Sequence, residues 1–405
     1  MNLSKLSNRI LFGISGGIAA YKAPDLLHGW IKAGCEVETI LTRSAEQFVS
    51  PLALSTLSKR RVWREDDFLS PEYGWQIPHI SLTDWADVFV VAPCTGNVLR
   101  MCAEGDSETL LGAALLANDK PLVLFPAMNC KMLSNPATRK NIETLTSRGV
   151  SVVDPDSGPL ACGYDGKGRL PQANVINDYV FRALCKNKDM KGLRVLVTAG
   201  PTHEYIDPVR YLSNPSSGKM GYEIARCAWY RGADVTLVSG PVSLVPPAGV
   251  SVVNVTSAEQ MYEACMDEAA DADVIIKAAA VGDFRAAAEA SQKIKRQKGE
   301  DLTLTLVQNR DIAAELGRIK KPDQLLVGFA AETQDLLANA RKKIASKNLD
   351  IIVVNDVLAK GAGFGCDTNS VTIMAPGRPD VKFSGGKDEV ADALLDAVLR
   401  GRTRG

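Results

Sequence analysis

Paired cysteines, which would indicate a zinc site or a disulfide framework, are missing from this sequence. The nine cysteines are scattered singly, none forms a C-x-x-C pair, and their number is odd. A net charge is missing too, because 47 basic residues balance 47 acidic ones, so no field attracts nucleic acid or an anionic membrane. These absences favour small-molecule chemistry and argue against a zinc site and a disulfide framework, while the ligands of any other metal stay unknown.

Long apolar runs are also lacking. No stretch approaches the roughly 20 residues that span a bilayer, and the apolar stretch after Arg9 is interrupted at Gly13, Gly16 and Gly17, unlike a signal peptide. We therefore expect a cytoplasmic protein that binds no membrane. Its 405 residues suit two domains of roughly 200 residues each.

Short β-branched runs alternate with turns and helical stretches, which predicts an α/β fold with two Rossmann-like, doubly wound parallel-sheet domains in tandem. A polar stretch at 186–192 suggests a joint, giving domains 1–188 and 189–405. One segment, Asp301–Val307, alternates strictly and predicts a half-exposed antiparallel strand. The other predicted strands are Arg9–Ile14, Val37–Thr42, Val88–Ala92, Leu122–Phe125, Val150–Val153, Arg194–Thr198, Asp234–Val238, Val250–Val255, Val274–Lys277, Leu325–Phe329 and Ile351–Asn355.

The segment from Gly13 to Lys22 joins the first strand to the first helix and carries Ser15, Gly16 and Gly17. Flexible backbone and a hydroxyl at a helix N-terminus can bind a phosphate. The glycine spacing fits neither the dinucleotide fingerprint nor the Walker pattern, so a phosphate-bearing cofactor and a tight turn stay open as alternatives.

Further candidates follow later strands. The loops Pro93–Asn97 and Pro126–Asn129 fall at the carboxyl ends of strands, where open α/β sheets bind ligands, although each taken alone is more often an ordinary turn. His79 is one of only three histidines, and a lone histidine is more often a surface residue than a catalyst. Cys162 lies in a glycine-rich loop, and a cysteine on a mobile flap is well placed for chemistry.

Together these motifs carry a resemblance: the whole chain resembles the bacterial bifunctional phosphopantothenoylcysteine decarboxylase and phosphopantothenate–cysteine ligase family, and its N-terminal half the flavin-dependent cysteine decarboxylases. The resemblance implies His79 as catalytic base, Asn129 as ligand of the substrate carboxylate and Cys162 as proton donor. It implies flavin mononucleotide (FMN) as cofactor, bound by Ser15, Gly16, Gly17, Pro93, Thr95 and Asn97. Glu108 and Thr109 depart from the family pattern in a segment expected to affect flavin affinity.

The implied chemistry explains this set of residues. Loss of CO2 from an N-acylated cysteine would leave a carbanion without an electron sink, unless a flavin first oxidises the thiol to a thioaldehyde. The carboxylate is then β to a C=S group, which accepts the electrons. Reduced flavin returns a hydride and an acid supplies the proton, the role implied for Cys162.

In the second half, the loops Thr198–Thr202 and Ser213–Gly221 again bring hydroxyls and glycines to a helix start. Ser216–Lys219 resembles a Walker loop only superficially, and a capped helix with a solvated lysine is equally favoured. The basic run Lys293–Lys298 alone is more often a solvated loop, but in an α/β cleft it could neutralise a triphosphate.

In order and spacing these segments resemble the ligase domain of the same family from about residue 193 to about residue 369. The resemblance implies CTP as co-substrate with Mg²⁺ on its phosphates: the carboxylate of 4'-phosphopantothenate attacks the α-phosphorus and cysteine captures the acyl cytidylate. Lys293 would stabilise charge at the α-phosphate, and Asn214 would serve the second half-reaction. The nucleotide set is Lys277, Ala278, Ala279, Asp283, Lys293, Arg310, Asp311, Ile312, Ala313, Phe329, Lys343 and Lys347, with Arg310 replacing a common proline.

Two other functions were weighed. A flavin-binding regulatory subunit would not need His79, Asn129 and Cys162, which are all present. A dinucleotide-dependent reductase would need G-x-G-x-x-G and a following acidic residue, and neither half has them. The resemblance further implies a large homo-oligomer, with trimeric decarboxylase and dimeric ligase contacts.

Overall fold

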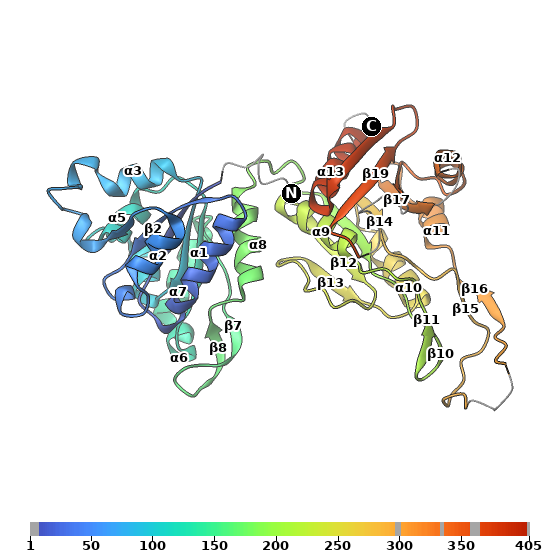
Figure 1. The fold of residues 1–405 in the computed structure, drawn as a ribbon, viewed down its shortest axis with the longest axis horizontal. Helices are drawn as coiled ribbons and strands as arrows, with labels where there is room; N and C mark the ends of the chain where they lie inside the picture. Colours follow the sequence, from blue (N-terminus) through green and yellow to red (C-terminus); the bar gives the residue numbers. More distant parts are fainter. Residues whose placement is uncertain (1–7, 296–300, 333–335, 357–364, 403–405) are drawn as a thin grey trace. The chain divides into compact units, whose positions relative to one another are not determined.

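A sheet that is wholly or mainly parallel forms the centre of each half of the chain (Figure 1). The computed structural model describes residues 8–295, 301–332, 336–356 and 365–402. The chain divides into two compact units, residues 2–186 and 187–405, and the boundary falls at the beginning of the polar stretch 186–192.

The sheet of the first unit has six strands in the order β3-β2-β1-β4-β5-β6, all of them parallel. A separate antiparallel hairpin, β7–β8, precedes the last helix. The strands are β1 (Arg9–Ile14), β2 (Glu36–Leu41), β3 (Val62–Arg64), β4 (Val88–Cys94), β5 (Leu122–Pro126), β6 (Ser151–Val152), β7 (Asp156–Pro159) and β8 (Asp165–Arg169). The α-helices are α1 (Ala23–Lys32), α2 (Pro51–Ser58), α3 (Pro78–Trp85), α4 (Gly96–Glu104), α5 (Leu110–Ala117), α6 (Cys130–Ser134), α7 (Pro136–Ser147) and α8 (Ala173–Leu184).

Helices cover both faces of this sheet because successive side chains of each strand point to opposite sides. Phe12 of β1 packs on one face with α1, α2 and α8, and its ring lies edge-on to Trp30 at 4.9 Å. Leu11, the preceding residue, packs on the other face with α3, α4, α5 and α7. Burial on both faces explains why the strands are almost continuously apolar.

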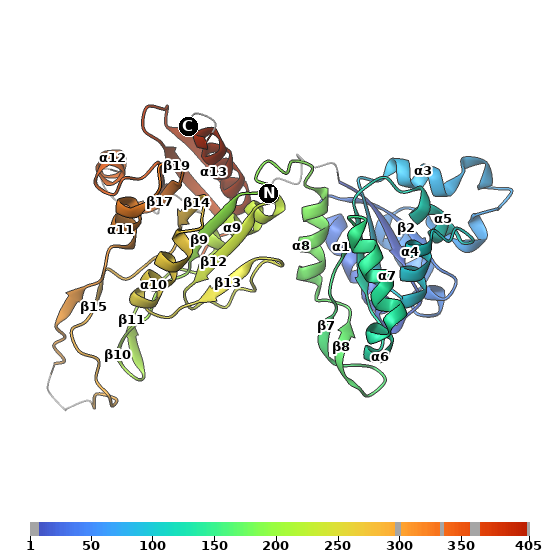
Figure 2. The ribbon, with the colours of Figure 1, turned by 180° about the vertical axis from the view of Figure 1, so that it is seen from behind.

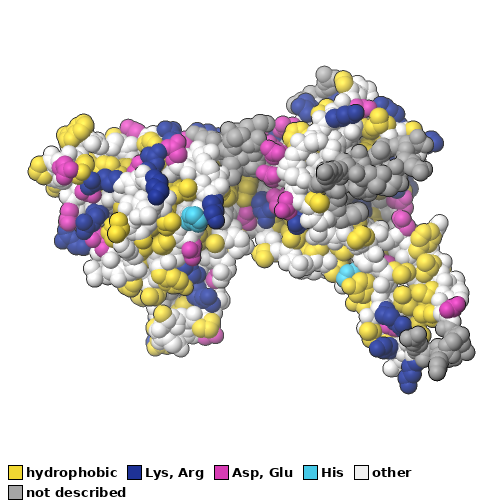
Figure 3. Space-filling model, in the orientation of Figure 1, with side chains coloured by type: hydrophobic (Ala, Val, Ile, Leu, Met, Phe, Trp, Pro, Cys, Tyr) yellow, Lys and Arg dark blue, Asp and Glu magenta, His cyan; other side chains and the backbone are white. Residues whose placement is uncertain are grey.

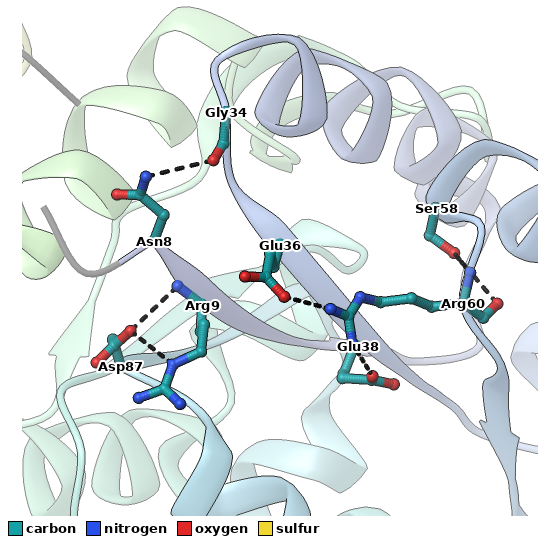
Figure 4. Close-up of polar contacts among 8 residues, drawn as sticks. All are labelled: Asn8, Arg9, Gly34, Glu36, Glu38, Ser58, Arg60 and Asp87. Carbon is teal, nitrogen blue, oxygen red and sulfur yellow. Dashed lines mark hydrogen bonds and ion pairs between the residues drawn. The ribbon is translucent and has the colours of Figure 1, made fainter. Parts of the chain in front are cut away.

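Ion pairs fix the amino ends of the strands (Figure 4). Asp87, just before β4, accepts hydrogen bonds from the backbone nitrogen (3.1 Å) and the Nε (3.2 Å) of Arg9, at the start of the neighbouring strand β1. Arg60 pairs with Glu36 and, at 2.7 Å, with Glu38 on β2. These contacts leave the opposite edge, at the carboxyl ends of the strands, for a ligand.

The sheet of the second unit has eight strands in the order β13-β12-β9-β14-β17-β18-β19-β20. The first six are parallel, and β19 and β20 extend the sheet as antiparallel strands. The strands are β9 (Arg194–Ala199), β12 (Asp234–Ser239), β13 (Ser251–Asn254), β14 (Val274–Lys277), β17 (Leu325–Glu332), β18 (Ile351–Asp356), β19 (Thr368–Met374) and β20 (Val381–Gly386). The helices are α9 (Lys219–Tyr230), α10 (Ala258–Ala269), α11 (Ile312–Ile319), α12 (Leu336–Ser346) and α13 (Lys387–Arg402).

Helices again lie on both faces. Met261 and Cys265 of α10 and Leu316 of α11 share one buried cluster with the sheet, and Ala340 of α12 joins it. Helices α9 and α13 pack against each other and the sheet. The prediction of two doubly wound α/β domains is therefore confirmed, with an antiparallel extension that the sequence did not indicate.

Two short antiparallel hairpins extend from the second unit and are called the arm (Figure 2). The first pairs β10 (Glu204–Asp207) with β11 (Arg210–Leu212), and the second pairs β15 (Phe284–Ala286) with β16 (Leu306–Gln308). The backbone nitrogen of Ala290 donates to the carbonyl of Ile206 at 3.0 Å, which ties the two hairpins together.

All the predicted parallel strands are present, but the prediction for Asp301–Val307 was wrong over most of its length. Only Leu306–Gln308 forms a strand, and it pairs antiparallel with β15. Leu302 and Leu306 are 54% and 43% exposed. Since no core lies beneath this segment, its alternation has no buried face to select an extended strand.

Candidate functional sites

Loops at the carboxyl ends of three neighbouring strands meet in the first unit. Ser15 follows β1, Thr95 follows β4, and these strands are adjacent in the sheet. The buried Ser15 hydroxyl donates to the carbonyl of Pro93 (2.7 Å) and accepts from the backbone nitrogen of Thr95 (3.0 Å). Ser15 thus joins the two predicted FMN loops, and its hydroxyl makes both hydrogen bonds within the protein.

The backbone of Gly16 and Gly17 leads into a short helix that has no side-chain cap. Gly16 lies against Ser44, since a Cβ at Gly16 would come within 2.3 Å of the Ser44 Oγ. Gly17 begins the short 3-10 helix Ile18–Lys22, and no side chain caps its amide groups. Asn97 is exposed in the first turn of α4, and its Nδ2 donates to the Met101 sulfur at 3.4 Å. Uncapped amides of this kind suit an anion.

The third loop reaches the hairpin. Asn129 caps α6, accepting from the Lys131 backbone nitrogen at 2.8 Å, and its Nδ2 lies 2.8 Å from the Cys162 sulfur. Cys162 is exposed in the turn between β7 and β8. Lys131 donates to the Tyr164 hydroxyl on the same turn at 3.0 Å. Two predicted catalytic residues, 33 positions apart in the sequence, are therefore in contact.

The environment of Cys162 lowers the pKa of its thiol below the ordinary value. The largest cause is a hydrogen bond from the Tyr164 backbone nitrogen, and the Asn129 amide adds to it. Both hydrogen bonds favour the thiolate over the thiol. A lower pKa makes Cys162 a better proton donor than an ordinary thiol.

We expect Asn129→Ala to raise the pKa of Cys162, because the variant removes one hydrogen bond to the thiolate. The rate of alkylation by iodoacetamide, followed at Cys162 by peptide mass spectrometry, should reach half its maximum at a higher pH than in the parent protein. Asn135→Ala is the matched control, since Asn135 caps the neighbouring helix α7 and makes no hydrogen bond to Cys162 in the described part of the chain. An unchanged pH midpoint in Asn129→Ala would contradict the assignment.

His79 lies in the first turn of α3, and its ring packs edge-on against Phe68 at 5.4 Å. Its Nδ1 is buried and has no hydrogen-bond partner among the described residues. None of the hydrogen bonds within that part of the chain links the ring to Asn129 or Cys162. The structure thus brings Asn129 and Cys162 together, and leaves His79 with an unsatisfied ring nitrogen.

Glu108 and Thr109, which were expected to affect flavin affinity, lie just before α5. Thr109 caps α5, its hydroxyl accepting from the Gly112 backbone nitrogen at 3.0 Å, and Glu108 is exposed. Cys94 is fully buried, and burial raises the pKa of its thiol well above the ordinary value. Cys94 therefore packs as a small apolar residue.

A cavity of about 740 Å³ lies in the second unit, at the carboxyl ends of β14 and β17. It is lined by every residue predicted for the ligase site except Lys293. The predicted residues in its lining are Asn214, Lys277, Ala278, Ala279, Asp283, Arg310, Asp311, Ile312, Ala313, Phe329, Lys343 and Lys347. Residues that are far apart in the sequence thus line one cavity.

Side chains hold the loop after β14 in place. Asn214 donates from its Nδ2 to the carbonyls of Ala280 (3.2 Å) and Val281 (3.1 Å). The backbone nitrogen of Ala279 is bound to the Thr198 hydroxyl at 3.1 Å. Lys277, at the end of β14, is buried, and burial lowers the pKa of its ammonium group. Hydrogen bonds to Thr198 of β9 and from Asn214, in the segment before α9, therefore fix the conformation of the loop that follows β14.

An acidic residue links two elements of the cavity wall. Asp311 caps α11 through the Ala314 backbone nitrogen (3.0 Å) and accepts an ion pair from Lys347 (2.8 Å). Burial raises the pKa of Asp311, but the Lys347 hydrogen bond and the cap lower it more, so that the carboxylate is favoured. The ammonium group of Lys347 is thus held at the cavity beside Asp311, with Lys343 one turn earlier.

Arg310 is directed partly away from the cavity. Its guanidinium pairs with Glu259 at 3.3 Å and lies 4.7 Å from the centre of the Tyr262 ring, both on α10. Arg310 therefore fastens the 309–311 loop to a helix.

Lys293 lies outside the lining of the cavity. It is exposed on the loop between β15 and β16, whose strands contribute Phe284 and Gln308 to the cavity edge. The next residue, Ile294, is anchored: its nitrogen donates to Asp207 (3.1 Å) and its carbonyl accepts from Arg210 (2.9 Å).

The lining of the same cavity also includes three polar residues outside the predicted set. Lys219 pairs with Asp367 at 2.7 Å, Lys387 is buried with the pKa of its ammonium group lowered by burial, and the Asn369 Oδ1 is buried without a partner among the described residues. Lys219 belongs to the Walker-like segment already noted, which was a usable signal. Lys387 and Asn369 lie in no motif.

Within the described parts of the chain, no group of three or more metal-ligating side chains comes together. The same residues include no helix long and apolar enough to cross a membrane.

Two family models match the chain, one per unit. Residues 2–184 match "Flavoprotein", and residues 190–401 match "DNA/pantothenate metabolism flavoprotein C-terminal domain".

Named relatives match almost the whole chain. It is 46% identical over 373 residues to the coenzyme A biosynthesis bifunctional protein CoaBC of Bacillus subtilis (strain 168), and 43% identical over 373 residues to that of Vibrio vulnificus (strain YJ016); each match covers 91% of both chains. Among solved structures, the C-terminal domain of a coenzyme A biosynthesis bifunctional protein CoaBC is 39% identical, covering 54% of this chain and 100% of that domain with a TM-score of 0.47.

Proposed function

Because the chain belongs to the family of coenzyme A biosynthesis bifunctional proteins CoaBC, we propose that it catalyses two consecutive reactions. Cysteine is first ligated to 4'-phosphopantothenate at the expense of CTP, and the product is then decarboxylated to 4'-phosphopantetheine. The contact of Asn129 with Cys162 carries this proposal, because it supplies a carboxylate ligand and a proton donor at one point. We assign the decarboxylase to residues 1–188, the ligase to residues 189–405, and the enzyme to the cytoplasm.

In the ligase reaction, the carboxylate of 4'-phosphopantothenate attacks the α-phosphorus of CTP and pyrophosphate leaves. The amine of cysteine then attacks the acyl cytidylate, releasing CMP and forming the amide. Lys277, Lys343 and Lys347 place positive charge around the 740 Å³ cavity, which suits a triphosphate. Asn214 anchors the loop after β14, where the reacting carbonyl would lie in the second half-reaction.

Magnesium would bind chiefly through the phosphates of CTP, which requires only one or two protein carboxylates. Asp283 and Asp311 line the cavity and fit that need. Asp311 is already paired with Lys347, so Asp283 is the better candidate ligand.

FMN would bind the first unit at the edge made by Gly16, Gly17 and the loop Pro93–Asn97. The uncapped amides after Gly17 suit its phosphate. Ser15 would contribute by fixing the two loops, since its hydroxyl joins Pro93 to Thr95. When bound, FMN supplies the oxidation of the substrate thiol and the later return of a hydride.

The protein's own side chains would bind the substrate carboxylate and transfer the protons. Asn129 would orient the substrate carboxylate, His79 would accept a proton, and Cys162 would protonate the carbon that lost CO2. The lowered pKa of Cys162 assists this donation. Because Cys162 lies in an exposed hairpin turn, the hairpin can cover the substrate after it binds.

Both reactions can be tested on the full-length protein. With 4'-phosphopantothenate, cysteine and CTP, we expect CMP, pyrophosphate, CO2 and 4'-phosphopantetheine in equal amounts, together with flavin absorbance of the purified protein. A colourless protein that forms CMP but no CO2 would retain only the ligase. A yellow protein without either activity would support a regulatory flavin-binding role instead.

We also propose a homo-oligomer, with trimeric contacts of the first unit and dimeric contacts of the second. Exposed apolar side chains support it, because they are costly to leave in water. In the second unit they gather on the arm, part of which Figure 3 displays: Tyr205, Val209, Tyr211, Phe284, Leu306 and Val307. In the first unit they include Leu69, Trp75 and Ile77, just before α3.

We expect Val209→Asp to weaken the proposed dimer, because a charge in an apolar interface must lose its water. Light scattering after gel filtration should give a smaller mass than that of the parent protein. Val381→Asp is a matched control, since Val381 is an exposed valine (44%, against 58% for Val209) outside the arm. Unchanged mass in Val209→Asp would contradict the placement of the contact.

A further inference from the structure

A second cavity, of about 510 Å³, lies in the first unit beside the contact of Asn129 with Cys162. Its wall is formed by α6, α7 and β8, which lie side by side in Figures 1 and 2. It begins at Cys130 and Lys131, the two residues that directly follow Asn129. A substrate whose carboxylate is held by Asn129 can therefore extend into it.

The lining combines apolar and cationic groups. Leu133 and Ile142 provide partly buried apolar surface. Lys131, Arg139 and Lys167 provide positive charge, against the carboxylates of Glu143 and Asp154, so the cations exceed the anions by one. The substrate of the proposed decarboxylase has the matching order of groups: a carboxylate at one end, then an apolar dimethyl carbon, and a phosphate dianion at the other end.

We propose that this cavity binds the pantothenoyl chain and that Arg139 and Lys167 recognise its 4'-phosphate, which makes them specificity-determining residues. The proposal rests on the decarboxylase activity proposed above. Arg139 is exposed and makes no ion pair with any residue that the structure describes, so its guanidinium is available for a phosphate. Lys167 pairs with Asp154 at 2.9 Å.

The pair of Lys167 with Asp154 does not prevent phosphate binding. The Asp154 side chain is 87% exposed, and an ion pair of that kind is worth little in water. A dianionic phosphate held between two cations can replace it. Lys131 is assigned differently, because its ammonium group donates to the Tyr164 hydroxyl and lies 4.5 Å from the centre of that ring, close to Cys162.

The test compares 4'-phosphopantothenoylcysteine with its unphosphorylated form, pantothenoylcysteine, as substrates of the full-length holoenzyme. The parent should prefer the phosphorylated form in kcat/KM. In Arg139→Ala and Lys167→Ala, we expect KM for that form to rise about tenfold, the factor that corresponds to about 1.4 kcal/mol. The kcat and the kinetics with pantothenoylcysteine should stay within about twofold. Lys140→Ala, an exposed cation next to Arg139 but outside the cavity, should match the parent.

A binding measurement separates recognition from turnover. Calorimetry with 4'-phosphopantetheine should show about tenfold weaker binding to Arg139→Ala, while binding of pantetheine stays unchanged. If the parent decarboxylates both substrates equally well, or if both variants retain the preference, phosphate recognition at this cavity is wrong although the decarboxylase stands. If neither substrate releases CO2, the decarboxylase proposal fails and this inference fails with it.

Discussion

Cys162→Ser is expected to lower the rate of 4'-phosphopantetheine formation by about 10²–10⁴-fold, the usual contribution of a general acid. Serine keeps the size of the side chain but is a far weaker acid than a thiol whose pKa is lowered by Tyr164 and Asn129. Without protonation of the carbon, a turnover cannot finish. CO2 release should therefore stop after about one equivalent per bound flavin, and the measurement is quenched-flow analysis of CO2 and product.

The second activity provides an internal control for Cys162→Ser. The variant should form CMP and 4'-phosphopantothenoylcysteine at the parent rate, and before substrate is added it should have the flavin absorbance of the parent. Cys366→Ser replaces the other exposed cysteine among the described residues and should behave as the parent. Formation of 4'-phosphopantetheine by Cys162→Ser at the parent rate would reject Cys162 as the proton donor.

The parallel strands could be predicted because burial on both faces leaves a continuous apolar run, as in Val88–Cys94. Strands β19 and β20 were missed for the opposite reason. In β19, buried Val371 and Ile373 alternate with half-buried Ser370 and Thr372, a weaker pattern than the buried centre of the sheet. Short hairpins such as β7–β8, rich in glycine and charge, carry almost no apolar signal.

The candidate sites were predictable where a motif lies in a loop after a strand, because all parallel strands deliver such loops to one edge. Asn129 and Ser15 are of this kind. Distances between loops are not written in the sequence, so the contact of Asn129 with Cys162 and the pairing of Asp311 with Lys347 required the structure. Lys387 was not predicted because it begins α13, a helix that follows the antiparallel strand β20 and not one of the parallel strands.

Lys293→Gln is expected to lower pyrophosphate release from CTP and 4'-phosphopantothenate by about 10²–10³-fold, the usual loss when one electrostatic stabiliser of a transition state is removed. Measured without cysteine, this release reports formation of the acyl cytidylate alone. Lys293 is exposed on a loop whose flanking strands place Phe284 and Gln308 at the cavity edge.

A matched control for Lys293→Gln is the substitution of Lys295, a second lysine in the same loop. Lys295 is exposed like Lys293, so Lys295→Gln removes the same charge and should stay within about twofold of the parent if position rather than charge alone matters. Both variants should decarboxylate added 4'-phosphopantothenoylcysteine at the parent rate, because the substitutions leave the first unit unchanged. Equal losses in the two variants would mean that the basic segment acts only by its summed field. No loss in Lys293→Gln would leave Lys277, Lys343 and Lys347, which already line the cavity, as the cations that stabilise the transferred phosphate.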